Sequence, residues 1–308
     1  MRAINRLLFM ILLIFIQMTV SEDNNEDDNA DEDGTEETCQ LSSNSSVLPI
    51  NIQKRQAICS ESYILDIHVR DDSTESFRTA YIGNPRTLRT RLGRQLFNLY
   101  VNFNNKRIAM YRARELVIRA PSEHSIDGQF LAGEAQFNFI LDKRFRKYTK
   151  NERITLSVLL EGENGINDTN FFTNLVDQLR KTPYQEILNS TDTNYIPYNE
   201  NGLSSFNTYF ARPIRFWAYN GTTTASNCDN EVLRIILKQR LKVQNEDLLY
   251  YQSYLKNLTE TETNARRELN PNSIKVYSCG ESCYDFLTEY IYFALLYSLL
   301  LYFLFYLI

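Results

Sequence analysis

The sequence predicts a β-dominated α+β domain, and three observations support this fold class. Runs of strand length with apolar or alternating character dominate the middle of the chain, at 63–69, 96–103, 136–141 and 154–160. Helical spacing is found at 171–180 and 247–258. Turn signals separate the strands, as at Asp127-Gly128. With 308 residues, 43% of them hydrophobic, the chain can build one large core.

The chain begins with the layout of a signal peptide, at residues 1–21. Arg2 and Arg6 precede the apolar run 7–20, and Thr19 and Ser21 offer small residues for cleavage. The alternative is a membrane anchor, but 14 apolar residues are too few to span a bilayer comfortably.

An acidic arm follows at 22–38. Ten of residues 22–37 are Asp or Glu, and apolar side chains are too few to offset the entropy of ordering, so we predict disorder. The whole chain has 33 Lys and Arg against 38 Asp and Glu, a net charge of -5. Residues 38–280 carry 31 basic and 25 acidic residues, a net charge of +6. The body of the chain is therefore mildly basic.

The most informative stretch reads Ala-Pro-Ser-Glu-His-Ser-Ile-Asp-Gly at 120–128 and Gly-Glu-Ala-Gln-Phe-Asn-Phe at 133–139. It resembles the metal-site region of the α-type carbonic anhydrases, in which a His-x-His strand runs into a Ser-Glu-His-Thr turn and the next strand reads Glu-Leu-His. Five further segments resemble the family in its order: 48–52, 96–100, 156–161, 170–180 and 219–224. The resemblance implies an α-carbonic-anhydrase-like domain at 39–276, with a large twisted, mostly antiparallel sheet and short peripheral helices.

The resemblance also implies that the zinc ligands are lost. The three histidine positions of the family hold Val117, Arg119 and Gln136, and the chain has only two histidines, His68 and His124. Three imidazole ligands are therefore impossible. Val117 has no lone pair, and the permanent cation of Arg119 opposes a dication. We expect an acatalytic relative that binds no zinc and needs no cofactor.

Three polar residues around that site match the family by position. Thr224 occupies the place of a threonine that accepts a hydrogen bond from the zinc-bound hydroxide and donates its own to a glutamate, and Glu123 occupies the place of that glutamate. Glu134 occupies the place of a carboxylate that orients a metal histidine. These residues are either a relic of catalysis or a structural cluster in which Glu123, His124 and Glu134 hydrogen-bond one another. We favour the structural cluster.

Arginines gather in two segments that the family's fold would bring to one cone-shaped cleft. Such a cleft suits sulfate, phosphate or carboxylate through bidentate hydrogen bonds. The alternative, which we favour, is a solvated basic face or arginines paired with local acids. The candidates for anion binding are Arg86, Arg89, Arg91 and Arg94 in the first segment and Arg112, Arg114 and Arg119 in the second.

Cysteines and glycosylation signals fit an oxidising, secretory compartment. The resemblance implies a Cys39–Cys228 disulfide, because secreted members of the family link these two places. The pairing of Cys59, Cys279 and Cys283 stays open. Five Asn-x-Ser/Thr sequons are candidate glycosylation sites: Asn44, Asn167, Asn189, Asn220 and Asn257.

Residues 277–308 form a spacer and a hydrophobic tail. The last eighteen residues, 291–308, carry no charge, and small residues stand upstream at Ser278, Gly280 and Ser282. This is the layout of a GPI-attachment signal. A membrane helix is the alternative, since eighteen apolar residues just suffice to span a bilayer, but no Lys or Arg follows the run.

Three functions remain. The first is an inactive carbonic-anhydrase-like surface protein that binds an extracellular protein or an anionic glycan. The second is an active carbonic anhydrase, a zinc lyase, with an atypical metal site. The third is a structural surface coat protein. We favour the first, with a membrane contact through the C-terminal anchor and no nucleic-acid partner.

Overall fold

The computed structural model describes ten segments of the chain, and all of them belong to a compact unit, Glu36–Ile308, which follows a first unit, Met1–Thr35. The predicted signal peptide and the acidic arm lie outside the described residues, as does the hydrophobic tail beyond residue 280. The described segments are 50–69, 76–82, 87–92, 97–103, 107–166, 170–190, 196–199, 212–222, 231–258 and 274–280.

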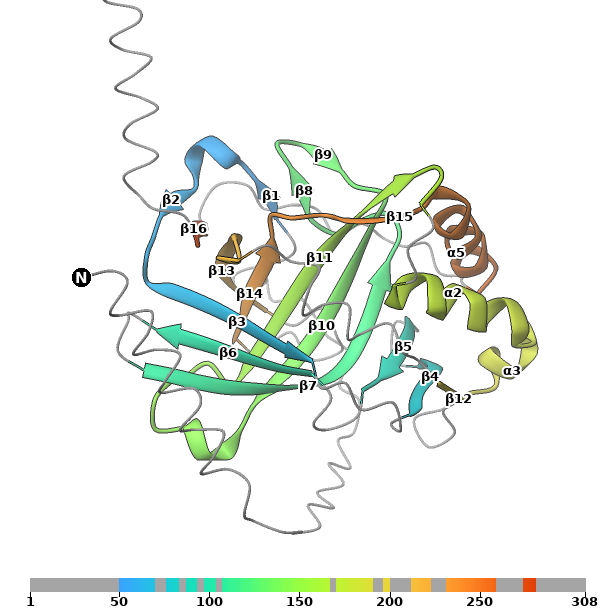
Figure 1. Cartoon of the computed structure of the whole chain (residues 1–308), viewed down its shortest axis with the longest axis horizontal. Coiled ribbons are helices and arrows are strands. Elements are labelled where there is room, and N and C mark those ends of the chain that lie inside the picture. Colours follow the sequence, from blue (N-terminus) through green and yellow to red (C-terminus); the bar gives the residue numbers. More distant parts are fainter. Residues whose placement is uncertain are drawn as a thin grey trace, which may run out of the picture. The chain divides into compact units, whose positions relative to one another are not determined.

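A large, mostly antiparallel sheet dominates the described part of the chain, which confirms the predicted fold class (Figure 1). Its strands follow one another in space as β12 (Ile196–Asn199), β4 (Ser76–Ile82), β5 (Thr87–Arg91), β7 (Arg107–Arg119), β10 (Gly133–Leu141), β11 (Arg153–Glu163), β14 (Glu231–Leu237), β13 (Phe216–Thr222), β16 (Tyr277–Cys279) and β2 (Ile58–Cys59).

Other strands extend this sheet or lie beside it. β6 (Phe97–Phe103) pairs with β7 and with β3 (Tyr63–Val69), and β15 (Leu241–Gln244) runs parallel to β11. A small second sheet contains β1 (Asn51–Ile52), β8 (Ser125–Ile126) and β9 (Gln129–Phe130). The predicted Asp-Gly turn joins β8 to β9. Asp127 and Gly128 both have positive φ, 49° and 81°. A two-residue hairpin loop of type I′ requires positive φ at both of its central residues.

The main hydrophobic core lies on one face of the large sheet, where helices cover it (Figure 1). The helices are α2 (Phe171–Lys181), α3 (Tyr184–Leu188) and α5 (Asn245–Leu258), and η1 (Lys54–Gln56) and η2 (Lys143–Phe145) are short 3-10 turns. Asn170 caps the N-terminus of α2, because its side-chain oxygen accepts from the amides of Phe172 and Thr173, at 2.9 and 3.1 Å. The amphipathic pattern at 171–180 therefore predicted this helix correctly.

A bulge in β7 decides which face its side chains occupy. Asn138 of β10 pairs with Glu115, whereas the next residue, Phe139, pairs with Ala113, so that Arg114 is the extra residue. The alternation of faces resets at this point. The core side chains are Tyr111 and Ala113 before the bulge and Leu116 and Ile118 after it, which leaves Arg112, Glu115, Val117 and Arg119 on the opposite face.

Candidate functional site

The residues at the three predicted ligand positions lie together on neighbouring strands. Val117 of β7 pairs with Gln136 of β10, and Arg119 of β7 pairs with Glu134. Their side chains share the face opposite the main core. Thr224, the predicted threonine of the site, lies outside the described residues.

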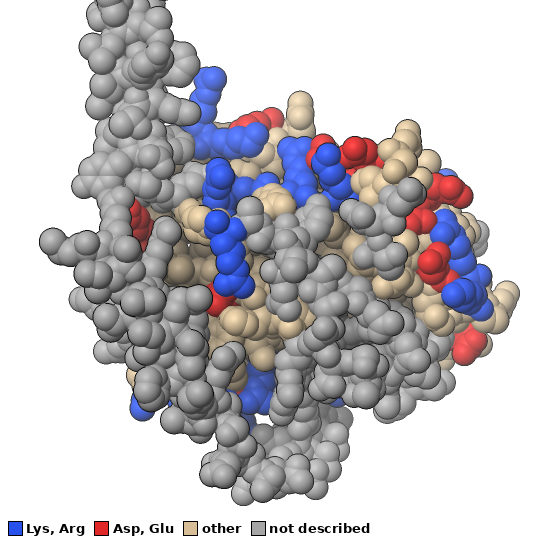
Figure 2. Space-filling model, in the orientation of Figure 1, with Lys and Arg blue, Asp and Glu red and all other residues tan. Residues whose placement is uncertain are grey.

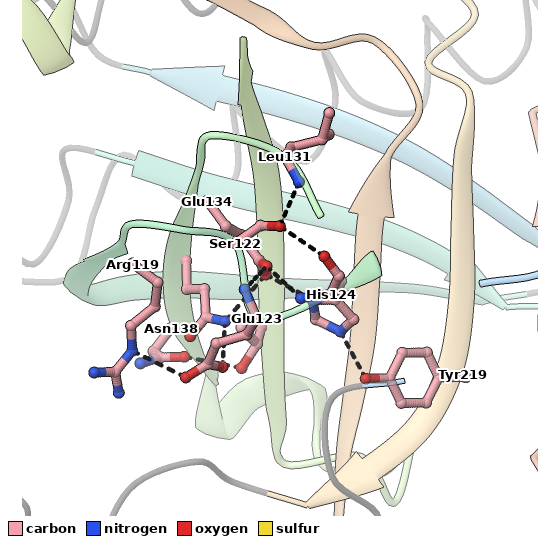
Figure 3. Close-up of polar contacts among 10 residues, drawn as sticks. Arg119, Ser122, Glu123, His124, Leu131, Glu134, Asn138 and Tyr219 are labelled. Atoms are coloured by element: carbon pink, nitrogen blue, oxygen red, sulfur yellow. Dashed lines mark hydrogen bonds and ion pairs between the residues drawn. The ribbon is translucent and has the colours of Figure 1, made fainter. Parts of the chain in front are cut away.

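Glu134 is the centre of a buried polar cluster on this face (Figure 3). One of its carboxylate oxygens accepts from the backbone amides of Glu123 and His124, both at 3.0 Å. The other lies 2.7 Å from Nδ1 of His124, and Nε2 of that ring lies 2.7 Å from the hydroxyl of Tyr219. His124 and Glu134 are both 0% exposed. The structure thus joins Glu123, His124 and Glu134, as the structural interpretation of these residues predicted.

The cluster fixes the ionisation of two of its members. Burial alone would raise the pKa of Glu134, but its contacts with His124 outweigh burial and hold this pKa well below the ordinary value of 4.5. Burial raises the pKa of Tyr219 well above 10.0, while the nearby cation of Arg234 acts in the opposite direction. The carboxyl group therefore stays ionised and the phenol keeps its proton at neutral pH.

Gln136 and Arg119 attach a second carboxylate, that of Glu123, to this cluster. The amide nitrogen of Gln136 donates to Glu123 Oε2 at 2.8 Å and to Glu134 Oε1 at 3.0 Å. Nε of Arg119 forms an ion pair with Glu123 Oε1 at 3.0 Å. Two of the predicted ligand positions thus carry donors that neutralise and bridge carboxylates.

This set of groups does not fit a zinc ion. Val117 offers no donor atom, and the guanidinium of Arg119 places a positive charge beside Glu123. Gln136 directs its amide nitrogen, a hydrogen-bond donor, at two carboxylates. Zinc in proteins is bound by neutral histidine nitrogens, cysteine thiolates or carboxylates, in a tetrahedral arrangement. No catalytic step through a metal follows from these residues.

Arg234 is a buried member of this region that the sequence analysis did not assign to the site. It is 1% exposed and pairs across strands with Tyr219 of β13 and Thr155 of β11. Gly221 makes room for it, because a Cβ there would lie 3.1 Å from the Tyr219 ring and 3.2 Å from Cδ of Arg234. The signal in the sequence is a single charged residue inside the apolar run 232–237.

Most of the described candidate arginines have acidic neighbours. Ion pairs join Arg89 to Glu115 at 3.6 Å, Arg112 to Asp142 at 2.6 Å and Arg119 to Glu123 at 3.0 Å. Arg91 and Arg114 are exposed, and Arg86 and Arg94 lie outside the described residues. The structure therefore brings Arg112 and Arg119 to one sheet face and pairs three of these arginines with local acids, as the favoured alternative predicted.

The secretory features are partly within the described residues. Cys59 is disulfide-bonded, and its partner, like Cys39 and Cys228, lies outside them. Cys279 is a free thiol whose pKa burial raises from 9.0 to about 12. Three sequon asparagines, Asn189, Asn220 and Asn257, are exposed, while Asn44 and Asn167 are not described. No helix among the described residues is long and apolar enough to cross a membrane.

Comparison with known proteins gives a consistent result. A model of the eukaryotic-type carbonic anhydrase family matches residues 31–279. No curated protein matches the chain. Among solved structures, carbonic anhydrase Cah3 from Chlamydomonas reinhardtii in complex with acetazolamide is similar, with a TM-score of 0.59 and 19% identity, covering 77% of this chain and 92% of that one.

Two further structures support the same fold. The α-carbonic anhydrase from Thermovibrio ammonificans in complex with sulfanilamide has a TM-score of 0.55 and 18% identity, and covers 78% of this chain and 88% of that one. Dioscorin complexed with ascorbate has a TM-score of 0.56 and 17% identity, with the same coverage of 78% and 88%.

Proposed function

Because the chain belongs to the eukaryotic-type carbonic anhydrase family, we propose that it is a catalytically inactive member, held at the cell surface, whose domain binds an extracellular partner. The observation that carries this proposal is the chemistry at the three ligand positions. Val117 has no lone pair, Arg119 is bound to Glu123, and Gln136 donates to Glu123 and Glu134.

The cluster also gives a physical reason why the domain is stable without a metal. Two carboxylates close together, one of them fully buried, need compensating positive charge or hydrogen-bond donors. Arg119 and Gln136 supply these from the chain itself, at positions where the family's enzymes hold metal ligands. The fold can therefore be kept while the chemistry is lost.

The proposal of a surface location rests on the ends of the chain and on its modification signals. A signal-peptide layout, a terminal hydrophobic tail and exposed sequons at Asn189, Asn220 and Asn257 all agree with passage through the secretory pathway. The disulfide at Cys59 agrees with an oxidising compartment. An anionic glycan is the partner class that suits the net charge of +6 at 38–280.

Elemental analysis and a hydration assay test the loss of catalysis. The purified full-length protein should contain no stoichiometric zinc and should hydrate carbon dioxide no faster than buffer. About one zinc per chain together with hydration blocked by a sulfonamide would instead establish an active enzyme with an atypical metal site. Zinc without activity would show that the cluster holds a metal after all, contrary to this proposal.

Retention on a heparin column tests the partner class. We expect retention at low salt that weakens as salt is raised, because exposed charges are screened beyond about 8 Å at physiological ionic strength. A protein that passes through unretained at low salt would favour a structural coat protein over a glycan-binding one.

A further inference from the structure

A cavity lies on the same sheet face as the polar cluster but shares none of its lining residues. It has a volume of about 350 Å³ and lies beside η1, β16 and the link from β14 to β15. Figure 2 shows Lys and Arg side chains gathered on the face that carries η1 and this link. The cavity is within the size range of small-molecule sites, about 300–1,000 Å³.

Its floor is apolar and firmly packed. Ile126, Leu159 and Trp217 line it, and they are only 4%, 1% and 6% exposed. They belong to a second hydrophobic cluster, on the opposite side of the sheet from the main core, that also contains Ile52 and Tyr219. The floor is therefore preformed, and a ligand would gain apolar contact without rearranging it.

Its rim is positive. Lys54, Lys238 and Arg240 line the cavity, and no carboxylate is among the described residues that do so. The ammonium of Lys238 donates to Ser278 Oγ at 2.7 Å and lies 5.3 Å from the centre of the Trp217 ring. The other two rim cations are also in contact with acids outside the cavity, Lys54 with Asp127 and Arg240 with Glu161.

The arginines of the former metal region are ion-paired as well, since each of Arg89, Arg112 and Arg119 has a carboxylate at 3.6 Å or less. What distinguishes the cavity is its apolar floor beneath the cations. A concave site with converging cations over a low-dielectric floor concentrates the field and attracts an anion.

We propose that this cavity binds an anionic sugar unit of a glycan. A sulfated or carboxylated sugar ring has an apolar face, which suits the floor, and anionic substituents at its edge, which suit Lys54, Lys238 and Arg240. The inference rests on the proposed function, because it names the place and the chemical class of the partner.

The chain supplies its own reporter for this site. Trp217 is the single tryptophan of the protein and it lines the cavity. An anion that draws the Lys238 ammonium away from the indole ring changes the tryptophan emission. Binding at the cavity is therefore measurable without a label.

The experiment is a titration of the full-length protein with a heparin hexasaccharide, followed by tryptophan fluorescence and by calorimetry. Lys238→Gln and Arg240→Gln should each weaken binding about tenfold, because each removes a charge-assisted hydrogen bond worth about 1.5 kcal/mol or more. Lys256→Gln on α5, which packs on the other face of the sheet, and the cleft variant Arg91→Gln/Arg114→Gln should bind like the parent. Thermal unfolding checks that every variant is folded.

The outcomes separate this inference from the proposed function. If calorimetry shows binding that the cleft variant loses and the cavity variants keep, the cavity assignment is wrong while glycan binding stands. If the parent binds no hexasaccharide at low salt, both are wrong. Replacing heparin with its desulfated form and with a polysialic acid fragment distinguishes sulfate from carboxylate as the recognised group. Either one bound at the cavity supports the inference.

Discussion

Buried Glu134 stays ionised because four donors surround it: the amides of Glu123 and His124, the His124 ring and the amide of Gln136. Its pKa is lowered in the folded chain below the ordinary 4.5, so its ionisation stabilises the fold above about pH 4.5 and this stability is lost as pH falls.

Glu134→Gln should therefore cost about 3 kcal/mol at pH 7. Urea unfolding should show the gap to the parent narrowing toward pH 3. As a control, Glu152→Gln, in a surface pair, should be nearly neutral. If the difference in unfolding free energy between the parent and Glu134→Gln does not change with pH, the ionisation of Glu134 does not stabilise the fold in this way.

Tyr251 and Tyr254, one turn apart on α5, allow a second prediction at the residue scale, because their hydroxyl groups differ in hydrogen bonding. The Tyr251 hydroxyl donates to the carbonyl of Ile118 at 3.2 Å, whereas that of Tyr254 is buried with no hydrogen-bond partner within the part of the chain that the structure describes. Tyr251→Phe should lose about 1 kcal/mol, because it removes the hydrogen bond to the Ile118 carbonyl. Tyr254→Phe should be neutral or gain up to about 1 kcal/mol. Thermal unfolding measures both, and a loss at Tyr254→Phe would reveal a partner for that hydroxyl.

At the scale of elements, the end of β16 depends on a glycine. Gly280 has φ +81°, and a Cβ there would lie 2.0 Å from the backbone oxygen of Ile214. Gly165 has a similar φ, +79°, but a Cβ there would meet nothing within 4 Å. Gly165→Ala should cost about 1–2 kcal/mol for the left-handed backbone alone. Gly280→Ala should cost about 1–3 kcal/mol more, because the clash adds to it. Equal losses in urea unfolding would show that the strand end relaxes freely.

Elements with a strong period could be read from the sequence, and irregular ones could not. The predicted run 63–69 coincides with β3, and the predicted helix 171–180 lacks only the last residue of α2. Both were predictable because burial of one face leaves a clear period in the sequence. The bulge at Arg114 was not predictable, since two adjacent polar residues, Arg114 and Glu115, are compatible with any register. β16 was not predicted because three residues are too few to show a period.

The candidate site was predictable in its chemistry but only partly in its contacts. The loss of three imidazoles follows from residue identity alone, as does the cation at Arg119. The partners of that cation and of Arg234 depend on cross-strand register, which links residues far apart in the sequence. The cavity with Trp217 could not be foreseen, because its lining comes from segments between residues 54 and 278.

At the scale of the whole molecule, the sheet limits where the proposed C-terminal anchor can be attached. β16 pairs with β13 on one side and β2 on the other. Cys279 is 0% exposed and Ser278 2% exposed, and Ser278 Oγ accepts from Lys238. Cleavage after Ser278 would remove Cys279 from the core and free the end of the strand. The sheet therefore requires the chain through Gly280. Of the small residues upstream of the tail, Gly280 and Ser282 leave the sheet intact as attachment points, and Ser278 does not.

The last prediction joins this limit to the proposed surface location. Cells that express the protein should release it on treatment with a phosphatidylinositol-specific phospholipase. Mass spectrometry of the released protein should find a C-terminal peptide that includes Cys279 and carries the anchor remnant at Gly280 or at Ser282. Ser282→Leu should then impair anchoring, while Ser278→Ala should leave the attachment position unchanged. An anchor at Ser278 would contradict the requirement for β16. A mature protein that keeps residues 291–308 would establish a membrane helix in place of the lipid anchor, because GPI attachment removes the hydrophobic tail.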